Sequence, residues 1–184
     1  MPDDFQPKLR GAQIIASTLV SGVVMILAAS IAYVNLWNNE LGLMRLAPWP
    51  IVTVFVIVSL VLIAPFAYIV PSAMTRTALR QMAAGTWRPP TGDDASSRKT
   101  DASKLITVRL STMLVSLALL EGIAILGCLA YVLEAQPLAL IAVIVPVLLM
   151  LKDFPTQSRF QVWFDRQSEQ LAEMRLQGNA ANEP

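Results

Sequence analysis

Histidine is absent from the sequence, and cysteine occurs once, as Cys128. Without histidine, a proton shuttle built on imidazole is excluded, and so are His-ligated haem and His-ligated metals. A single cysteine can form neither an intramolecular disulfide nor a cysteine-ligated cluster. The sequence also has no phosphate-binding glycine loop, no Ser-His-Asp set and no metal-ligand cluster. These absences predict a protein that is not an enzyme and that has no metal or other cofactor.

Charged residues are the second shortage, at 15% of the chain, against roughly 25% in soluble domains. Hydrophobic residues make up 55% and gather in four long runs, at 11–36, 51–70, 105–134 and 138–151. A helix rises about 1.5 Å per residue, so roughly 20 residues cross the hydrocarbon core of a bilayer. The sequence therefore predicts an all-α membrane bundle of four transmembrane helices, ending in a cytoplasmic amphipathic helix.

The fourth apolar run is the weakest of these predicted spans. It holds about 14 clean residues, or about 17 when counted through Phe154, and Pro146 lies in its middle. That length is at the lower limit for a crossing. A re-entrant segment is the alternative, although a short hairpin after a full span favours a return crossing.

The runs divide the chain into five segments. We expect an N-terminal cytoplasmic tail at 1–10, a first transmembrane hairpin at 11–70, and a basic cytoplasmic loop at 71–104. A second hairpin follows at 105–154, and an amphipathic helix with a disordered tail at 155–184. Pro65 is expected to kink the second span. Residues 72–87 are expected to continue as a helix on the membrane surface.

The basic residues are distributed asymmetrically about these spans. With four spans, 13 of the 14 Lys and Arg residues fall on one side, and Arg45 alone falls on the other. Cytoplasmic loops carry the excess of Lys and Arg. The sequence thus predicts a multi-pass protein of the inner (plasma) membrane with both termini in the cytoplasm. The Arg residues near position 80 lack the interleaved aromatic residues of a nucleic-acid groove, so no nucleic-acid partner is expected.

One acid, Glu121, interrupts the third apolar run near its middle. An ionised carboxyl group at mid-depth costs about 2.5 kcal/mol or more, so it should face protein or water rather than lipid. It is either a proton or cation carrier, or a neutral acid hydrogen-bonded to a neighbouring helix. Arg109 lies about 18 Å away along the same helix and cannot pair with it. We interpret the Arg109 side chain as extending to the membrane–water interface on the cytoplasmic side. We interpret Cys128 as a small apolar side chain that fills space between helices.

Small residues recur at three- and four-residue spacing within the predicted spans. Such residues let helix backbones approach closely in lipid. The candidates for helix packing are Ser17, Ser21, Gly22, Ala118, Gly122 and Gly127.

Apolar residues also recur at helical spacing after residue 155. The apolar positions of this segment are Phe160, Trp163, Phe164, Leu171 and Met174. A helix with this pattern lies on a membrane surface or packs on a partner.

The second half of the chain carries a resemblance. The stretches Ala-Leu-Leu-Glu-Gly at 118–122, Leu-Ala-Tyr-Val-Leu-Glu-Ala-Gln-Pro-Leu at 129–138 and Phe-Pro-Thr-Gln-Ser-Arg at 154–159, with Trp163, resemble an uncharacterised family of small bacterial four-span inner-membrane proteins. The resemblance implies an architecture and no activity. A weaker likeness joins the Glu121 hairpin to the proteolipid ring subunit of rotary ATPases. Here, however, the acid is on the first helix of its hairpin, and no glycine ladder runs along the second.

Together these features predict a non-catalytic integral membrane subunit or scaffold. Its expected partners are the lipid bilayer and either further copies of itself or a larger membrane complex. The alternative is proton or ion conduction through the carboxyl group of Glu121.

The charge asymmetry generates a topology prediction. Single cysteines placed at Asn39 and at Ser97, in a Cys128→Ser background, should react differently with an impermeant thiol reagent added to intact cells. Asn39→Cys should be labelled and Ser97→Cys protected, because the first lies in an outer connection and the second in a cytoplasmic loop. The reverse pattern would overturn the orientation.

Overall fold

The computed structural model describes residues 5–37, 50–88 and 100–180. Within these ranges the regular structure is entirely helical. The elements are α1 (Phe5–Trp37), α2 (Ile51–Ala83), α3 (Asp101–Glu134), the 3₁₀ helix η2 (Pro137–Leu140), α4 (Ile141–Lys152) and α5 (Gln157–Ala180). The predicted helical class is confirmed.

Several helices extend beyond their apolar runs. α1 begins at Phe5, six residues before the run does, and α3 begins at Asp101. α2 continues without a break through Pro65 and Pro71 to Ala83. The helix expected over residues 72–87 is therefore continuous with the second span, and it ends at Ala83. Each proline removes one backbone hydrogen bond, but the bonds on either side keep the helix intact. α5 likewise continues through Gly178, and the expected tail at 181–184 lies outside the described residues.

Within the described residues, the number of helices long and apolar enough to cross a membrane is three or four. α1, α2 and α3 are each long and apolar enough to cross a membrane. The segment Pro137–Lys152 reaches that length only together with α5, and the two are bent by 69° where they meet. The turn at Asp153–Thr156 produces this bend, since α4 ends at Lys152 and α5 starts at Gln157.

The chain divides into two compact units. Unit 1 comprises Met1–Gln13, Ile69–Leu114 and Pro155–Pro184. Unit 2 comprises Ile14–Tyr68 and Val115–Phe154. Three helices, α1, α2 and α3, contribute a segment to each unit.

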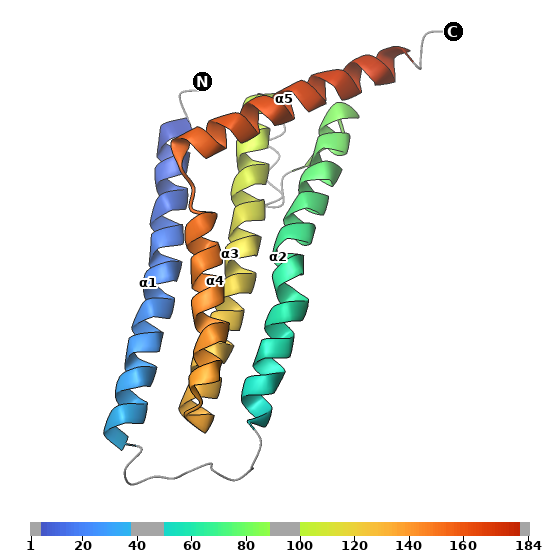
Figure 1. Cartoon of the computed structure of the whole chain (residues 1–184). Helices are drawn as coiled ribbons and strands as arrows, with labels where there is room; N and C mark the ends of the chain where they lie inside the picture. Colours follow the sequence, from blue (N-terminus) through green and yellow to red (C-terminus); the bar gives the residue numbers. More distant parts are fainter. Residues whose placement is uncertain (1–4, 38–49, 89–99, 181–184) are drawn as a thin grey trace. The chain divides into compact units, whose positions relative to one another are not determined.

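In unit 1, α5 lies across the ends of α1, α2 and α3 (Figure 1), and its apolar residues complete two buried clusters with them. Leu171 is buried against α2 and α3, and Phe160 is buried against α1 and α3. The five apolar residues singled out on this helix, Phe160, Trp163, Phe164, Leu171 and Met174, all take part in these two clusters. Their apolar side is thus occupied by the same chain, and neither a membrane surface nor a partner is needed to cover it.

Polar contacts fix the far end of α5. The Arg175 Nη1 atom donates a hydrogen bond of 2.7 Å to Asp101 Oδ2, and Nη2 donates one of 3.4 Å to the Met82 carbonyl oxygen. Asp101 lies ahead of the apolar run that starts at Leu105. The hydrogen bond from Arg175 lowers the pKa of this carboxyl group below its ordinary value. One arginine therefore joins α5 to both α2 and α3.

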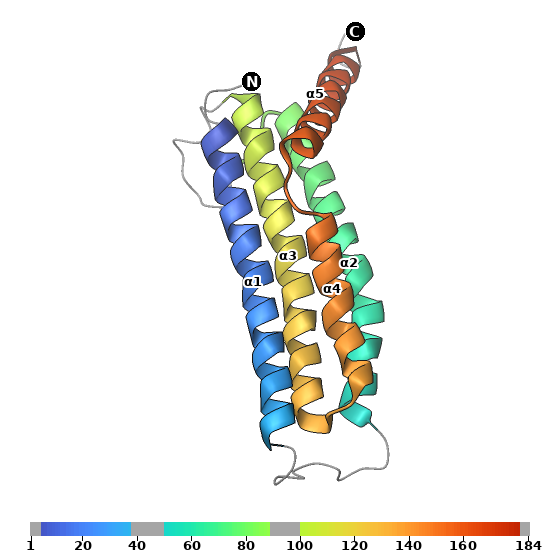
Figure 2. The ribbon, with the colours of Figure 1, turned by 60° about the vertical axis from the view of Figure 1, so that its left-hand side comes forward.

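In unit 2, α3 packs against three other helices. Ala124 and Cys128 join Val23 of α1 and Val143 of α4 in one buried cluster. Ala130 joins Val56 of α2 in a second cluster. Figure 2 shows the segments of α1, α3 and α4 running side by side. Cys128 is 2% exposed and packs as the apolar filler that we expected.

α3 and α4 approach each other closely at Gly127. A Cβ atom added there would lie 2.8 Å from Cγ2 of Val143, and 3.0 and 3.1 Å from the backbone C and O atoms of Ala142. The Val143 side chain can rotate away, whereas the Ala142 backbone cannot move without moving α4. Glycine at 127 is therefore what lets α3 and α4 meet at this distance.

Gly127→Ala should lower the free energy of unfolding by about 1–3 kcal/mol, because the added methyl group overpacks the α3–α4 contact. Gly22→Ala is the matched control, since a Cβ atom there meets nothing within 4 Å. It should be neutral or stabilising by up to about 1 kcal/mol. Unfolding followed by circular dichroism in mild detergent measures both changes. Equal effects of the two variants would contradict the assignment of the close contact to Gly127.

Candidate functional site

The outer side of α3 in unit 2 presents an exposed stripe around Glu121. Ala118 and Gly122 are exposed, Ile125 is 39% exposed and Leu129 is 52% exposed. These positions follow one another at steps of four, three and four residues, so they lie on one side of the helix. Glu121 is partly buried at the edge of the stripe. We call these five residues the Glu121 face.

The Glu121 carboxyl group has no hydrogen-bond partner among the residues that the structure describes. Two hydroxyl groups of α2 in the same unit do not supply one. Ser59 donates to the Phe55 carbonyl oxygen of its own helix. The Thr53 hydroxyl is fully buried and has no partner in the described part of the chain. Glu121 thus presents an unsatisfied polar group beside small, exposed residues.

The three residues of α1 that were considered for helix packing also lie away from the packed helices. Ser17 and Ser21 are exposed, and Gly22 is partly buried with no atom near its missing Cβ. Buried positions on this helix are instead occupied by Ala12, Ala16 and Val23. Of the six small residues considered for helix packing, Gly127 is the one placed in a close contact within the chain. Packing of the other five against a second molecule stays a prediction.

A second acid, Glu134, performs a role that sequence reasoning missed. It lies at the last position of α3, and its carboxylate accepts two backbone hydrogen bonds from the first turn of α2. The Val52 amide reaches Oε1 at 2.7 Å, and the Thr53 amide reaches Oε2 at 2.9 Å. The first amides of a helix lack partners within the helix, and an anion there also interacts favourably with the helix dipole. Glu134 therefore caps α2 from another helix.

The sequence carried one signal for this cap. The first residues of α2, after Pro50, hold no acidic residue, so that end of the helix required an acceptor from elsewhere. The sequence did not identify Glu134, at the end of the third apolar run, as that acceptor, because Val52 and Glu134 are separated by 82 positions.

In unit 1, Arg109 of α3 contacts α5. Its guanidinium carbon lies 5.2 Å from the ring centroid of Trp163, a cation–π distance. The Trp163 ring in turn packs at 59° on Phe160, with centroids 6.0 Å apart. Arg109 was expected to extend to the membrane interface. The structure places its charged end on an aromatic ring that belongs to the same unit.

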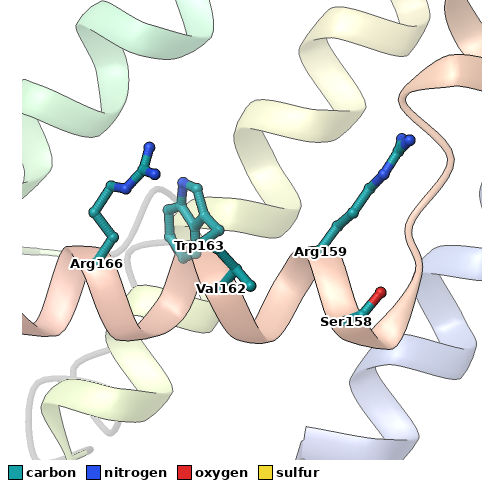
Figure 3. A pocket seen from close by; sticks show the side chains of 5 residues that line it. All are labelled: Ser158, Arg159, Val162, Trp163 and Arg166. Atoms are coloured by element: carbon teal, nitrogen blue, oxygen red, sulfur yellow. The ribbon is translucent and has the colours of Figure 1, made fainter.

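An open pocket of about 360 Å³ adjoins this contact, and Trp163 forms part of its wall (Figure 3). Its lining residues are Ser158, Arg159, Val162, Trp163 and Arg166. Among the described residues no group of three or more Cys, Asp or Glu side chains is arranged to hold a metal ion.

Comparison of the chain with models of protein families, with curated proteins and with solved structures gives no match. The function is therefore inferred from the geometry within each of the two units.

Loss of the Glu134 cap should destabilise the fold. Glu134→Ala leaves two first-turn amides of α2 without acceptors and should lower the free energy of unfolding by about 0.5–2 kcal/mol, the usual effect of losing a helix cap. Glu134→Gln keeps one carbonyl acceptor and should lose about half as much. Glu169→Gln, at an exposed position of α5, is the control. Denaturant titration in mixed micelles gives the three values, and an Ala variant as stable as the wild type would refute the capping role.

Proposed function

We propose that this protein is a non-catalytic integral membrane subunit that associates with copies of itself, or with another membrane protein, through the Glu121 face. The observation that carries the proposal is the position of Glu121. Its carboxyl group lies in the middle of an apolar helix, without a hydrogen-bond partner among the described residues, and next to Ala118 and Gly122, which are exposed.

Helix association in lipid supports this reading. Lipid tails are as apolar as leucine, so helices associate through close packing of small residues and through interhelical hydrogen bonds. Ala118 and Gly122 offer the small surface, and Glu121 offers the hydrogen bond. A carboxyl group left in lipid is unfavourable, so a partner helix that hydrogen-bonds to it is favoured.

The membrane arrangement is part of the same proposal. α1, α2 and α3 cross the inner membrane, and Pro137–Lys152 returns the chain as a short fourth span. The two termini then lie in the cytoplasm, which agrees with the bias of Lys and Arg toward that side. α5 follows the bend after α4 and covers the apolar core of unit 1.

Proton or ion conduction through Glu121 is the second candidate function. The same unpaired carboxyl group motivates it, because intramembrane ionisable groups often mark ion pathways. An ion pathway usually needs further polar side chains along its length, and the apolar run of α3 offers no second acid before Glu134. We therefore rank it below association.

Two substitutions separate these functions. Glu121→Gln keeps the shape and a hydrogen-bond donor, so it should preserve oligomer size. Glu121→Leu removes the polar group and should weaken association by about 0.6–2 kcal/mol, the contribution of one interhelical hydrogen bond. Glu169→Gln on α5 serves as the matched control. Oligomer size in mild detergent and proton flux in reconstituted vesicles are measured on the same preparations.

We expect no proton flux from the wild type or any variant, normal assembly for Gln and weakened assembly for Leu. Wild-type flux that is abolished by Gln while assembly stays intact would reject the association model and support conduction, because an amide does not titrate near neutral pH.

A further inference from the structure

Three arginines surround Trp163 in unit 1. Arg159 and Arg166 lie one turn before and one turn after it on α5. Figure 3 shows the side chains of Arg159, Trp163 and Arg166 extending from the same side of the helix. Arg109 approaches the Trp163 ring from α3, at 5.2 Å. Arg159 and Arg166 are exposed, and they are separated by about 10 Å along the helix axis.

This arrangement has the chemistry of a phosphate site. A guanidinium group presents a planar set of donors that binds phosphate oxygens in pairs. Two such groups facing one pocket concentrate positive charge on one side of α5. Asp165 lies on α5 as well, but residues two positions apart on a helix do not face one another, so it does not share the side of Trp163.

Apolar surface next to the arginines indicates which class of phosphate compound fits the site. Val162, in the wall of the pocket, is 61% exposed although α5 is otherwise largely polar. Trp163 is half-buried, and indole rings favour the level of lipid headgroups. A free phosphate ion would use the arginines alone, whereas a phospholipid would also cover Val162 with its glycerol and upper acyl carbons.

We propose that Arg159, Trp163 and Arg166, supported by Arg109, form a binding site for the headgroup phosphate of an anionic phospholipid. The site attaches α5 to the inner leaflet, while the apolar residues of this helix, Trp163 among them, pack on unit 1. The proposal rests on the membrane placement proposed above, and it is independent of self-association through Glu121.

The test uses the full chain in a neutral mild detergent, with bound lipid counted by native mass spectrometry. Phosphatidylglycerol, phosphatidylcholine and inorganic phosphate are the three probes. We expect retention of phosphatidylglycerol and little retention of the other two. Arg159→Gln combined with Arg166→Gln should weaken phosphatidylglycerol binding about tenfold or more, because each arginine near an anionic surface contributes severalfold.

Arg76→Gln combined with Arg80→Gln is the matched control. Both residues are exposed and lie on α2 in the same unit, so the pair removes the same charge without touching the pocket. Its affinity for phosphatidylglycerol should stay within about twofold of the wild type. Arg159→Lys with Arg166→Lys keeps the charge but removes the paired donors, and should weaken binding severalfold. This variant also decides the matter if the Gln pair does not fold.

Equal losses in the two Gln pairs would overturn the site in favour of unspecific surface charge. Wild-type affinity in the Lys pair would do the same. Phosphatidylcholine retained as well as phosphatidylglycerol, or inorganic phosphate bound as tightly as either, would overturn the assignment to an anionic lipid. Oligomer size is recorded in every sample, so a failure of self-association is distinguished from a failure of the lipid site.

Discussion

Polar groups in apolar surroundings must find partners, and this requirement governs most of the structure. The backbone meets it by forming long helices, because each helix satisfies its own amides and carbonyls except at the ends. At the start of α2 the unpaired amides are met by the Glu134 carboxylate. At the middle of α3 the carboxyl group of Glu121 has no such partner in the described chain. Glu134 therefore caps a helix of the fold, and Glu121 is the acid proposed to serve association.

The two units meet this requirement with different side chains. In unit 2 the helices approach through small residues, and the contact between α3 and α4 depends on the missing side chain of Gly127. In unit 1 the packing uses large aromatic and aliphatic residues of α5, and arginines connect helices through a carboxylate and an aromatic ring. Small residues suit surroundings in which nothing polar holds helices together. Arginine with tryptophan suits an interface between apolar and aqueous surroundings.

Apolar runs and helical periodicity were enough to predict the helices, because both depend on neighbouring residues. The sequence allowed the helix to continue after Pro71 but did not fix where it ends, since a proline that only costs one hydrogen bond looks the same in a sequence as one that ends a helix. Small-residue spacing predicted where close packing could occur, but Gly127 and Gly122 are alike in sequence and differ in the structure. The Glu134 cap and the Arg109–Trp163 contact join distant positions, which no local pattern specifies. The apolar residues of α5 pack within unit 1, whereas the sequence pattern alone predicted a membrane surface or a partner.

The cap on α2 also sets an order of events during synthesis. The Glu134 codon is translated 82 residues after that of Val52. A ribosome adds about 5–20 residues per second, so the first turn of α2 waits on the order of 4–16 s for its acceptor. Until Glu134 is in place, the amides at this end of the helix have no protein acceptor and are served by water or other polar groups. Completion of α3 then replaces that temporary solvation with a protein acceptor, so the first helical hairpin reaches its final state only after the second has begun to form.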